Sequence, residues 1–598
     1  MLNKIKAIAD ITKQLLFIFD KRQKRTCIWV FLSMVLCSVL ELLGVTAIYP
    51  FIDILMYQDS LKDKEYMEIL YYIKPDISNM SVIMIMGIMI ILIYIIKNAL
   101  MIASAYLQNH FAARVERELS THMLDAFMRR PYQFFLNTNS GVVIRGITTD
   151  VEGVYKLLIG LFELVSSTIT VVILGVLLLV SDPGMAIGAL ILCGLCFVAV
   201  LAAFKGPMKK AGGDIRTSVA RKYQYATQAV TGIKEIIVTD RIDSFVEQYE
   251  EASIVKEKAT LVHGFVNASP KRIIEGVCIG GFIGLVCLKV VSGTDISTFV
   301  PTLGMFAMSA FKILPAVSAM SSQLATIIFY KQHLQSTYEN LKEANEYANE
   351  LKLLEYKTEK EDSSEIAFRE ILKIDNIKWK YLNAPSYVLD ELSMEIKKGE
   401  SIAFIGASGA GKTTLADVIM GLLPPQSGSV KMDSIDILTV KKQWAKIIGY
   451  VPQTVFLIDD TIRNNVAFGM KEDEISDEKV WHALEQAQLK AFVESLPDGL
   501  DTIVGERGVK FSGGQRQRVA IARALYEAPD ILIFDEATSA LDGETEEAVM
   551  QSIDALQGHI TLIIVAHRLT TIRNCDKIYE IKDGKAVLKE KKEIFQAN

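Results

Sequence analysis

The chain has 598 residues, of which 51% are hydrophobic, with a mean hydropathy of +0.28 and a formal net charge of −6. This length exceeds what one hydrophobic core organises, so at least two domains are expected. The small negative charge excludes the basic footprint of a nucleic-acid-binding protein. The seven cysteines are scattered and indicate no disulfide framework.

The apolar excess lies before about residue 330, in runs long enough to cross a hydrocarbon core, which takes about 20 helical residues. These runs predict six spanning helices, at 26–50, 80–106, 157–180, 185–204, 273–292 and 296–330. The first run is too long for a secretory signal and has no small-residue cleavage site, so we expect it to be a retained span. A soluble core would not need so many uninterrupted runs.

Lysine and arginine in the connecting segments predict the orientation of these spans. The N-terminal segment and residues 110–145 and 205–235 are rich in both, so we expect them to face the cytoplasm. The polar segment 57–79 and the turn 181–184 are then external. Residues 57–79 could lie on the membrane surface as a helix or form a solvated loop.

Two short patterns inside apolar runs predict packing rather than chemistry. Cys193 and Cys196 form a C-x-x-C with no second pair and no nearby histidine, so we expect them to pack against lipid. Gly276, Gly280 and Gly284 recur every four residues, which predicts a helix packed closely against another.

Ionisable side chains inside the apolar runs are costly in lipid and usually face a cavity or a partner. Lys97, Lys271 and Lys312 belong to three different runs, and Glu41 and Glu163 also lie within apolar runs. The lysines snorkel to the interface, pair with a glutamate, or line a substrate cavity, and the residues alone leave these alternatives open. Three cavity cations on different helices would suit an anionic headgroup.

The strongest local pattern is a phosphate-binding loop that follows a predicted strand at 401–405 and opens a predicted helix. The loop reads Gly406-Ala407-Ser408-Gly409-Ala410-Gly411-Lys412-Thr413, with Thr414 next. Its glycines let backbone N–H groups point at phosphate oxygens, and the helix N-terminus adds a favourable dipole. We expect Lys412 to reach the β- and γ-phosphates of ATP, and the Thr413 hydroxyl to bind Mg²⁺.

A second pattern is a pair of acids after the apolar run 531–534. Asp535 ends this predicted buried strand and Glu536 follows directly. Two such acids are often merely solvated, but a phosphate loop earlier in the same domain favours a role for both. We expect Asp535 to bind Mg²⁺ and Glu536 to orient or deprotonate the attacking water.

Between these patterns lies Phe511-Ser512-Gly513-Gly514-Gln515, which closely resembles the signature motif of ABC ATPases, usually written with Leu in place of Phe511. Other motifs match the family in its own order: Tyr381 the adenine-stacking aromatic, Gln453 the Mg²⁺-sensing loop glutamine, Glu506 the exporter loop before the signature, residues 539–542 the D-loop, and His567 the switch histidine. The membrane half also matches the exporter pattern, so the resemblance covers the whole chain.

This resemblance implies an α-helical six-span transmembrane domain followed by an α/β P-loop NTPase domain. The expected limits are 1–330 for the transmembrane domain, 331–365 for a helical extension and linker, and 366–598 for the nucleotide-binding domain. It implies a multi-pass protein of the cell inner (plasma) membrane, with a cytoplasmic ATPase that hydrolyses ATP to drive transport.

In ABC ATPases the signature of one subunit closes over the phosphate loop of the other, and this chain has one copy of each. The resemblance therefore implies a dimer, most simply a homodimer, with ATP and Mg²⁺ as cofactors. Glu536, His567 and Lys412 would be catalytic, and Gln453 would join Thr413 and Asp535 at the metal. Segments near 137–150 and 230–245 resemble the coupling helices of exporters.

For the cargo, the polar segment 57–79 and the residues around Lys271 and Lys312 resemble the bacterial lipid-linked oligosaccharide flippases. In that subfamily arginines meet the pyrophosphate, and here the matching positions are Lys97, Lys271 and Lys312, which keep the charge but lose the bidentate fork. The implied partners are a polyprenyl-pyrophosphate glycan and membrane lipids. A multidrug, lipid or peptide exporter on the same scaffold is the alternative.

Overall fold

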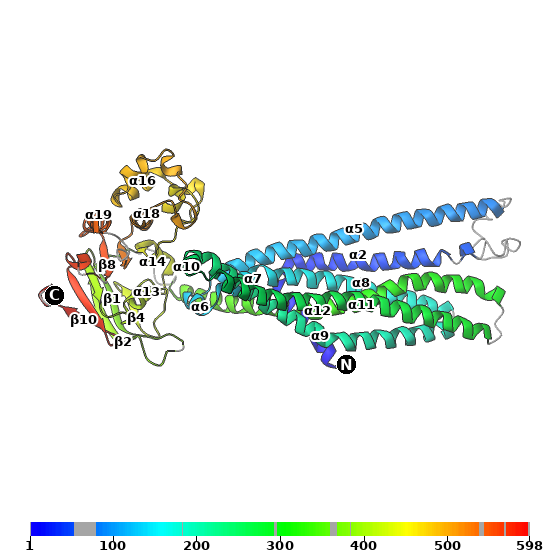
Figure 1. Cartoon of the computed structure of the whole chain (residues 1–598). Helices are drawn as coiled ribbons and strands as arrows, with labels where there is room; N and C mark the ends of the chain where they lie inside the picture. Colours follow the sequence, from blue (N-terminus) through cyan, green and yellow to red (C-terminus); the bar gives the residue numbers. More distant parts are fainter. Residues whose placement is uncertain are drawn as a thin grey trace. The chain divides into compact units, whose positions relative to one another are not determined.

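The computed structural model describes residues 2–48, 50–52, 79–181, 183–291, 296–358, 367–382, 384–536, 543–566, 568 and 570–595. The chain divides into two compact units (Figure 1). The first, here called the helical unit, contains Met1–Arg130 and Asn137–Tyr347. The second, the sheet unit, contains Pro131–Leu136 and Ala348–Asn598. The external segment predicted at 57–79 lies outside the described residues except for Asn79.

Helices, most of them long, make up the first part of the chain. They are α1 (Leu2–Ile18), α2 (Lys21–Thr46), α5 (Asn79–Met128), α6 (Tyr132–Asn137), α7 (Ser140–Ile147), α8 (Thr149–Ser181), α9 (Pro183–Thr231), α10 (Ile233–Val238), α11 (Ile242–Val291) and α12 (Ile296–Thr358). The 50 residues of α5 extend about 75 Å at 1.5 Å per residue. Since a hydrocarbon core is about 30 Å thick, such a helix continues well beyond the membrane.

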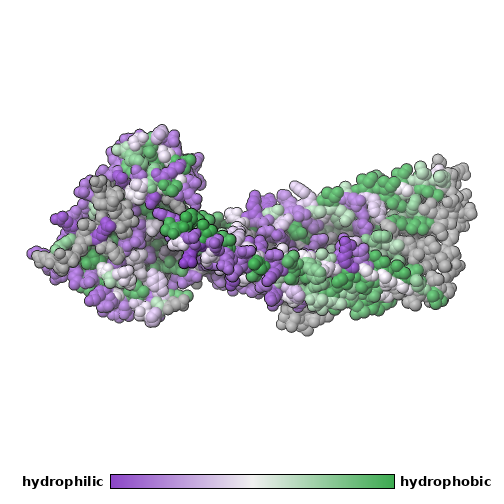
Figure 2. Space-filling model, viewed as in Figure 1, coloured by the Kyte–Doolittle hydropathy of each residue, from purple (hydrophilic) through white to green (hydrophobic). Residues whose placement is uncertain are grey.

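Large apolar side chains lie on the outside of the helical unit. Trp29, Ile102, Tyr106, Val180 and Leu195 are 68 to 80% exposed. Figure 2 shows hydrophobic residues gathered along one stretch of this unit, next to a stretch that is mainly hydrophilic. Exposing so much apolar surface to water is unfavourable, whereas lipid accommodates it.

Five helical stretches among the described residues are long and apolar enough to cross a membrane. They are Lys21–Ile52, Met80–Met128, Ser140–Ser181, Pro183–Thr231 and Ser309–Asn349. The span predicted at 273–292 falls in α11, which is described as far as Val291, and remains a prediction.

Local sequence signals set two of the helix ends. Asp20 caps the N-terminus of α2 and forms a capping box with Gln23, which satisfies backbone N–H groups that have no intrahelical partner. Pro183 occupies the first position of α9, where its missing N–H costs nothing. The predicted turn at 181–184 thus separates α8 from α9, with Asp182 outside the described residues.

For two packing predictions the described residues show the surroundings in more detail. A Cβ added at Gly276, Gly280 or Gly284 would meet no described atom within 4 Å, so this stripe is not a tight helix contact within the chain. Cys193 does not simply face lipid: its Sγ lies 3.0 Å from Cys278 Sγ, where α9 meets α11. Helical spacing places residues on one face but does not say what that face meets.

The sheet unit contains the elements from β1 onward. Its strands are β1 (Ile371–Trp379), β2 (Leu389–Lys397), β3 (Ser401–Ile405), β4 (Ser427–Met432), β5 (Ile435–Asp436), β6 (Ile448–Val451), β7 (Ile531–Asp535), β8 (Thr561–Val565), β9 (Lys577–Lys582) and β10 (Lys585–Lys589). Its α-helices are α13 (Lys412–Ile419), α14 (Lys441–Ile447), α15 (Ile462–Val466), α16 (Asp477–Gln486), α17 (Lys490–Glu494), α18 (Gly513–Leu525), α19 (Gly543–Asp554) and α20 (Lys591–Phe595). Short 3₁₀ helices are Glu472–Glu474, Gly499–Asp501, Glu506–Gly508 and Thr570–Ile572.

Two sheets form the frame of this unit. One is antiparallel, in the order β2-β1-β4-β5, and the other has the order β10-β9-β3-β8-β7-β6. Within the second sheet, β9, β3, β8, β7 and β6 pair in parallel. Alternate residues of β7 enter two different cores, Ile531 and Ile533 on one face and Leu532 and Phe534 on the other. Burial on both faces explains why such strands are continuous apolar runs.

A buried charge network joins four helices of the helical unit. Asp150, at the start of α8, is fully buried, and its Oδ1 lies 2.8 Å from His333 Nδ1 of α12. Arg145 Nε of α7 lies 3.4 Å from Oδ2, and Arg216 Nε of α9 lies 3.7 Å from Oδ1. A Cβ at Gly153 would come within 2.6 Å of the His333 side chain, so glycine is needed for α8 and α12 to approach this closely.

Replacing Asp150 by Asn should destabilise the protein, because Arg145 and Arg216 then lose the anion they share. Breaking a buried pair costs about 3–5 kcal/mol, and we expect a lower thermal midpoint for the purified protein. The control is Glu152→Gln, whose exposed carboxylate pairs with Lys156 one turn along the helix and should contribute no more than about 0.5 kcal/mol. Equal midpoints for both variants would contradict the prediction.

Candidate functional site: a phosphate loop and its acidic partners

The predicted phosphate loop lies between β3 and α13. Gly406, Gly409 and Gly411 have φ values of +145°, +81° and +101°, a region that side-chain-bearing residues rarely adopt. A Cβ at Gly406 would lie 2.4 Å from the carbonyl oxygen of Ile581. The loop therefore needs glycine both for its backbone turn and for its approach to the neighbouring strand β9.

Lys412 begins α13 and folds back over the loop. Its side chain is buried, and Nζ donates to the carbonyl oxygens of Gly406 at 2.9 Å and Ala407 at 3.2 Å. A buried ammonium held by two neutral carbonyls can exchange them for a stronger anionic acceptor, so this geometry suits the oxygens of a phosphate.

The acids of β7 reach the same edge of the sheet. Asp535 ends this strand, is buried, and its Oδ1 accepts from the Thr413 hydroxyl at 3.4 Å. β3 and β7 are separated by β8 alone, and all three run parallel, so their carboxyl ends meet. A hydroxyl and a carboxylate placed together are hard oxygen ligands of the kind that Mg²⁺ prefers.

Glu536 follows Asp535 in a strained conformation. Its φ of +48° is left-handed, which is uncommon for a residue with a side chain. Its N–H donates to the carbonyl oxygen of Val565 at 3.0 Å, which holds the turn, and its Oε2 accepts from Gln453 Nε2 at 2.7 Å. Gln453 follows β6, the strand next to β7, so the predicted base and the loop glutamine are brought together.

Tyr381, the predicted adenine contact, lies next to the start of α13. It is 41% exposed, and its ring meets Trp379 edge to face with centroids 4.4 Å apart. Its hydroxyl lies 3.2 Å from Thr414 Oγ1, so the structure joins it directly to the first turn of α13. A partly exposed aromatic ring fixed at this place can stack on a base.

The signature-like segment caps α18. The Ser512 hydroxyl accepts from Gln515 N–H, and Gln515 Oε1 accepts from Ser512 N–H at 2.8 Å, a reciprocal capping box. Phe511 is buried and meets Phe492 edge to face, so it keeps the apolar contact expected of the usual leucine. Gly513 and Gly514 form the first turn of α18. Among the described residues, no hydrogen bond joins Ser512 or Gln515 to the phosphate loop of the same chain.

Two predicted elements cannot be placed. His567 and the D-loop residues 539–542 lie outside the described residues. Glu506 is described and begins a 3₁₀ helix ahead of the signature segment.

Sequence reasoning missed three side chains near the edge that holds Asp535. Burial, and then the Asp535 carboxylate, raise the pKa of Asp417 to about 6. Burial and the Asp535 and Asp417 carboxylates raise the pKa of Tyr450 above its ordinary value. Asp417 follows Thr413 by four residues on α13, and this helical spacing was the signal available to find it.

The third is Tyr132, from a segment distant in the sequence. Pro131–Leu136 belongs to the sheet unit, although the residues on both sides of it belong to the helical unit. Burial, followed by the Asp417 carboxylate and Tyr381, raises the pKa of Tyr132. Tyr132 therefore lies near Asp417 and Tyr381 in the sheet unit, and no local motif identifies it.

Comparison with known proteins decides the family. Residues 389–539 match the family described as ABC transporter, and residues 27–275 match the ABC transporter transmembrane region. The chain is 30% identical over 508 residues to the ATP-dependent lipid A-core flippase of Syntrophus aciditrophicus (strain SB), covering 83% of this chain and 81% of that protein. The chain belongs to the ABC transporter family.

Two further similarities agree with this assignment. The ATP-dependent lipid A-core flippase of Francisella tularensis subsp. tularensis (strain SCHU S4 / Schu 4) is 43% identical over 241 residues, 39% of each chain. The solved structure of a bacterial Atm1-family ABC exporter with ATP bound has a TM-score of 0.75 and 23% identity, over 97% of each chain. This chain is thus an ABC exporter: a multi-pass helical membrane region followed by an ABC ATPase domain, which binds and hydrolyses ATP to drive transport.

The three lysines predicted to line the substrate cavity of this exporter are not equivalent. Lys97 on α5 is only 2% exposed and its Nζ lies 3.1 Å from Glu41 Oε2, which is the pairing with a glutamate that the sequence left open as an alternative to cavity lining. Lys312 on α12 pairs with Oε1 of the same glutamate at 2.8 Å but is 35% exposed. Lys271 on α11 is exposed and is not part of this cluster.

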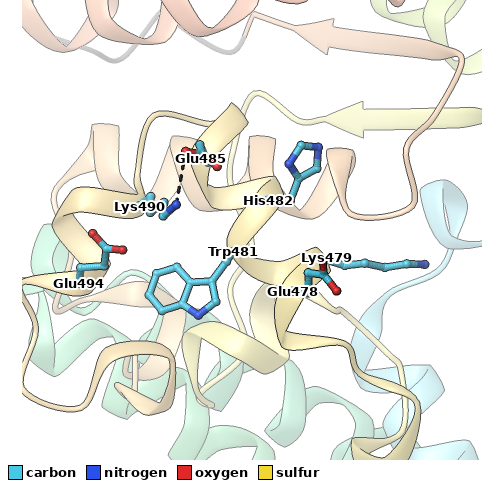
Figure 3. Close-up of a pocket in the computed structure, with 7 residues that line it drawn as sticks. All are labelled: Glu478, Lys479, Trp481, His482, Glu485, Lys490 and Glu494. Carbon is cyan, nitrogen blue, oxygen red and sulfur yellow. Dashed lines mark hydrogen bonds and ion pairs between the residues drawn. The ribbon is translucent and has the colours of Figure 1, made fainter.

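The exporter also has a surface pocket of about 620 Å³ in the ATPase domain, formed by α16 and α17 (Figure 3). Its lining residues are Glu478, Lys479, Trp481, His482, Glu485, Lys490 and Glu494. Lys490 Nζ and Glu485 Oε1 form an ion pair at 3.3 Å in its lining (Figure 3). None of the residues predicted to bind ATP lines this pocket, so it is separate from the nucleotide site.

Glu536→Gln should leave ATP binding intact and lower hydrolysis by at least about a hundredfold, the smaller end of what a positioned general base contributes. The amide keeps the size of the side chain but cannot accept the proton. The measurement is ATPase turnover beside equilibrium binding of a fluorescent ATP analogue, with the exposed Glu527→Gln as control. Near-normal turnover in Glu536→Gln would show that another group activates the water.

Asp417→Asn should stabilise the nucleotide-free protein at pH 7.5 and have little effect at pH 4. The folded-state pKa of about 6 lies above the unfolded value of about 3.9, so the folded protein favours the protonated form. The protonated Asp417 carboxyl is therefore compatible with the fold below pH 4, and the stability that depends on this proton is lost as pH rises through 6. Thermal midpoints at the two pH values, without nucleotide and Mg²⁺, measure it, and the exposed Asp459→Asn is the control. An equal shift at both pH values would contradict this origin.

Proposed function

We propose that this exporter flips a lipid-linked oligosaccharide, a glycan on a polyprenyl pyrophosphate, across the inner membrane. The observation that carries the proposal is Lys312, a half-accessible ammonium within an apolar stretch of α12. Its ion-pair partner among the described residues, Glu41, is shared with Lys97, so the two cations lack a second anion at a place where uncompensated charge is costly. A pyrophosphate headgroup is such an anion, and the polyprenyl tail can remain in lipid.

The similarity to ATP-dependent lipid A-core flippases supports a lipid cargo. It also favours a second candidate, the lipid A-core glycolipid that these relatives are named for. Both candidates are large glycolipids, whereas a multidrug or peptide exporter on the same scaffold would need no dedicated intramembrane cation.

The proposed ATP chemistry uses residues at one edge of the sheet. Lys412 and the loop N–H groups hold the phosphates. Thr413, Asp535 and Gln453 supply oxygens that fit Mg²⁺, which would neutralise charge on the phosphates when bound. Glu536, held by the Val565 carbonyl, accepts a proton from the attacking water, and His567 is proposed as the switch histidine.

We propose a homodimer with the ATPase domains in the cytoplasm. The hydrogen bonds of Ser512 and Gln515 among the described residues are local ones and do not reach the phosphate loop of the same chain, which supports a second copy completing each site. Pro131–Leu136, together with the segments near 137–150 and 230–245, would transmit closure to the spans. The proposed domain limits stay at 1–330, 331–365 and 366–598.

Proteoliposomes that contain the purified exporter should flip a fluorescent polyprenyl-pyrophosphate glycan with ATP and Mg²⁺. We expect Glu536→Gln to abolish flipping, and Lys312→Ala to slow it by about tenfold or more, the effect of about 1.4 kcal/mol. The control is Lys205→Ala, outside the predicted cavity. Unlabelled lipid A-core is added as competitor. If flipping requires Glu536 but is unchanged in Lys312→Ala, Lys312 does not recognise the headgroup. Stronger inhibition by lipid A-core than by the unlabelled glycan lipid would favour the second candidate.

A further inference from the structure

A buried carboxylate in the membrane half holds two lysines from two other helices. Glu41 of α2 is 7% exposed, and its two oxygens face different ammonium groups. Oε2 lies 3.1 Å from Lys97 Nζ of α5, and Oε1 lies 2.8 Å from Lys312 Nζ of α12. One negative charge therefore serves two positive charges, and the cluster keeps one excess cation in a region that penalises uncompensated charge.

The two lysines are held to different degrees. Lys97 is almost completely buried, and its Nζ also lies 4.4 Å from the centroid of the Tyr94 ring, a cation–π contact. The Tyr94 hydroxyl donates to the Gly44 carbonyl of α2 at 3.3 Å, which fixes that ring. Lys312 has Glu41 as its ion-pair partner among the described residues and is 35% exposed. Lys312 is thus the cation that an incoming anion can reach.

The helix contacts around the cluster are also unequal. α2 and α5 are joined by the Lys97–Glu41 pair and by the hydroxyls of Ser33 and Ser104, 2.9 Å apart. The Lys312–Glu41 pair joins α12 to α2. Loss of the Lys312 pair would break this contact between α12 and α2 and leave the pairing of α2 with α5 intact.

We propose that Glu41 is the resident counter-ion of an anion-binding site, and that the phosphate headgroup of a lipid substrate binds by displacing Glu41 from Lys312. A phosphate supplies the charge that the cluster lacks and several acceptor oxygens for the three donors of the ammonium. A lipid without an anionic group cannot replace the carboxylate, so Glu41 acts as a specificity filter for headgroups that carry an anion. This inference rests on the proposed lipid-phosphate cargo and identifies what its headgroup must compete with.

The test measures affinity for one defined lipid, a fluorescent polyprenyl diphosphate without glycan, by anisotropy on the purified full chain. Glu41→Gln removes the competing charge at nearly constant shape, and we expect about tenfold tighter binding, the factor that 1.4 kcal/mol produces. Lys312→Gln should weaken binding by about the same factor, and Lys312→Arg should restore much of it.

The matched control is Glu163→Gln. Glu163 is another carboxylate in the apolar part of this unit, and its Oε2 accepts from the neutral Gln323 amide at 2.6 Å. Glu163→Gln should leave the affinity for polyprenyl diphosphate unchanged. Polyprenol without phosphate should bind wild type and Glu41→Gln equally. Should Glu41→Gln not be recovered as monodisperse protein, Glu41→Asp, whose shorter side chain loosens the Lys312 contact, must shift affinity in the same direction.

Unchanged or weaker binding in Glu41→Gln would overturn the inference, and so would inorganic pyrophosphate that competes as well as the lipid, since the site would then serve a free anion. The proposed function fails separately. If flipping of the glycan lipid requires Glu536 but Glu41→Gln binds polyprenyl diphosphate no more tightly than wild type, only the proposed role of Glu41 is contradicted. If Glu41→Gln binds polyprenyl diphosphate tenfold more tightly but the glycan lipid is not flipped, only the proposed cargo is contradicted.

Discussion

Parallel pairing of β3, β8, β7 and β6 is the constraint on which the ATP site depends. Because these strands run in one direction, the segments after their carboxyl ends meet at one edge of the sheet. That edge brings Lys412, Asp535, Glu536 and Gln453 together from distant parts of the chain. The left-handed conformation of Glu536 persists because the neighbouring strand accepts its N–H, so the same sheet that gathers the residues also holds the strained one.

The helical unit follows a different rule, in which one buried carboxylate organises cations from several helices. Asp150 holds Arg145, Arg216 and His333, and Glu41 holds Lys97 and Lys312. Both clusters contain more cationic groups than anions, and each joins helices that are far apart in the sequence. Such contacts are strong only while the geometry is kept, which suits helices that must hold one arrangement and then exchange it for another.

Charge links ATP hydrolysis to the membrane half in the proposed transport cycle. Hydrolysis at the sheet edge supplies the free energy, and the ion pairs between helices are the contacts that a cargo or a domain movement can replace. A headgroup that takes the place of Glu41 beside Lys312 would loosen α12 from α2 at the moment of binding. Substrate recognition and helix movement would then be one event, with no need for a separate trigger.

The sequence by itself determined the family and the nucleotide chemistry, because the phosphate loop, the Asp535–Glu536 pair and the signature segment are local patterns with fixed strand–loop–helix context. It also determined the membrane character, since hydrophobic length is read directly from the chain. It could not distinguish the buried Lys97 from the partly exposed Lys312, or assign Pro131–Leu136 to the sheet unit. Nor could it show that a Cβ at Gly276, Gly280 or Gly284 would meet no described atom within 4 Å. Those outcomes depend on which helix faces which across long sequence separations, and only the tertiary structure decides that.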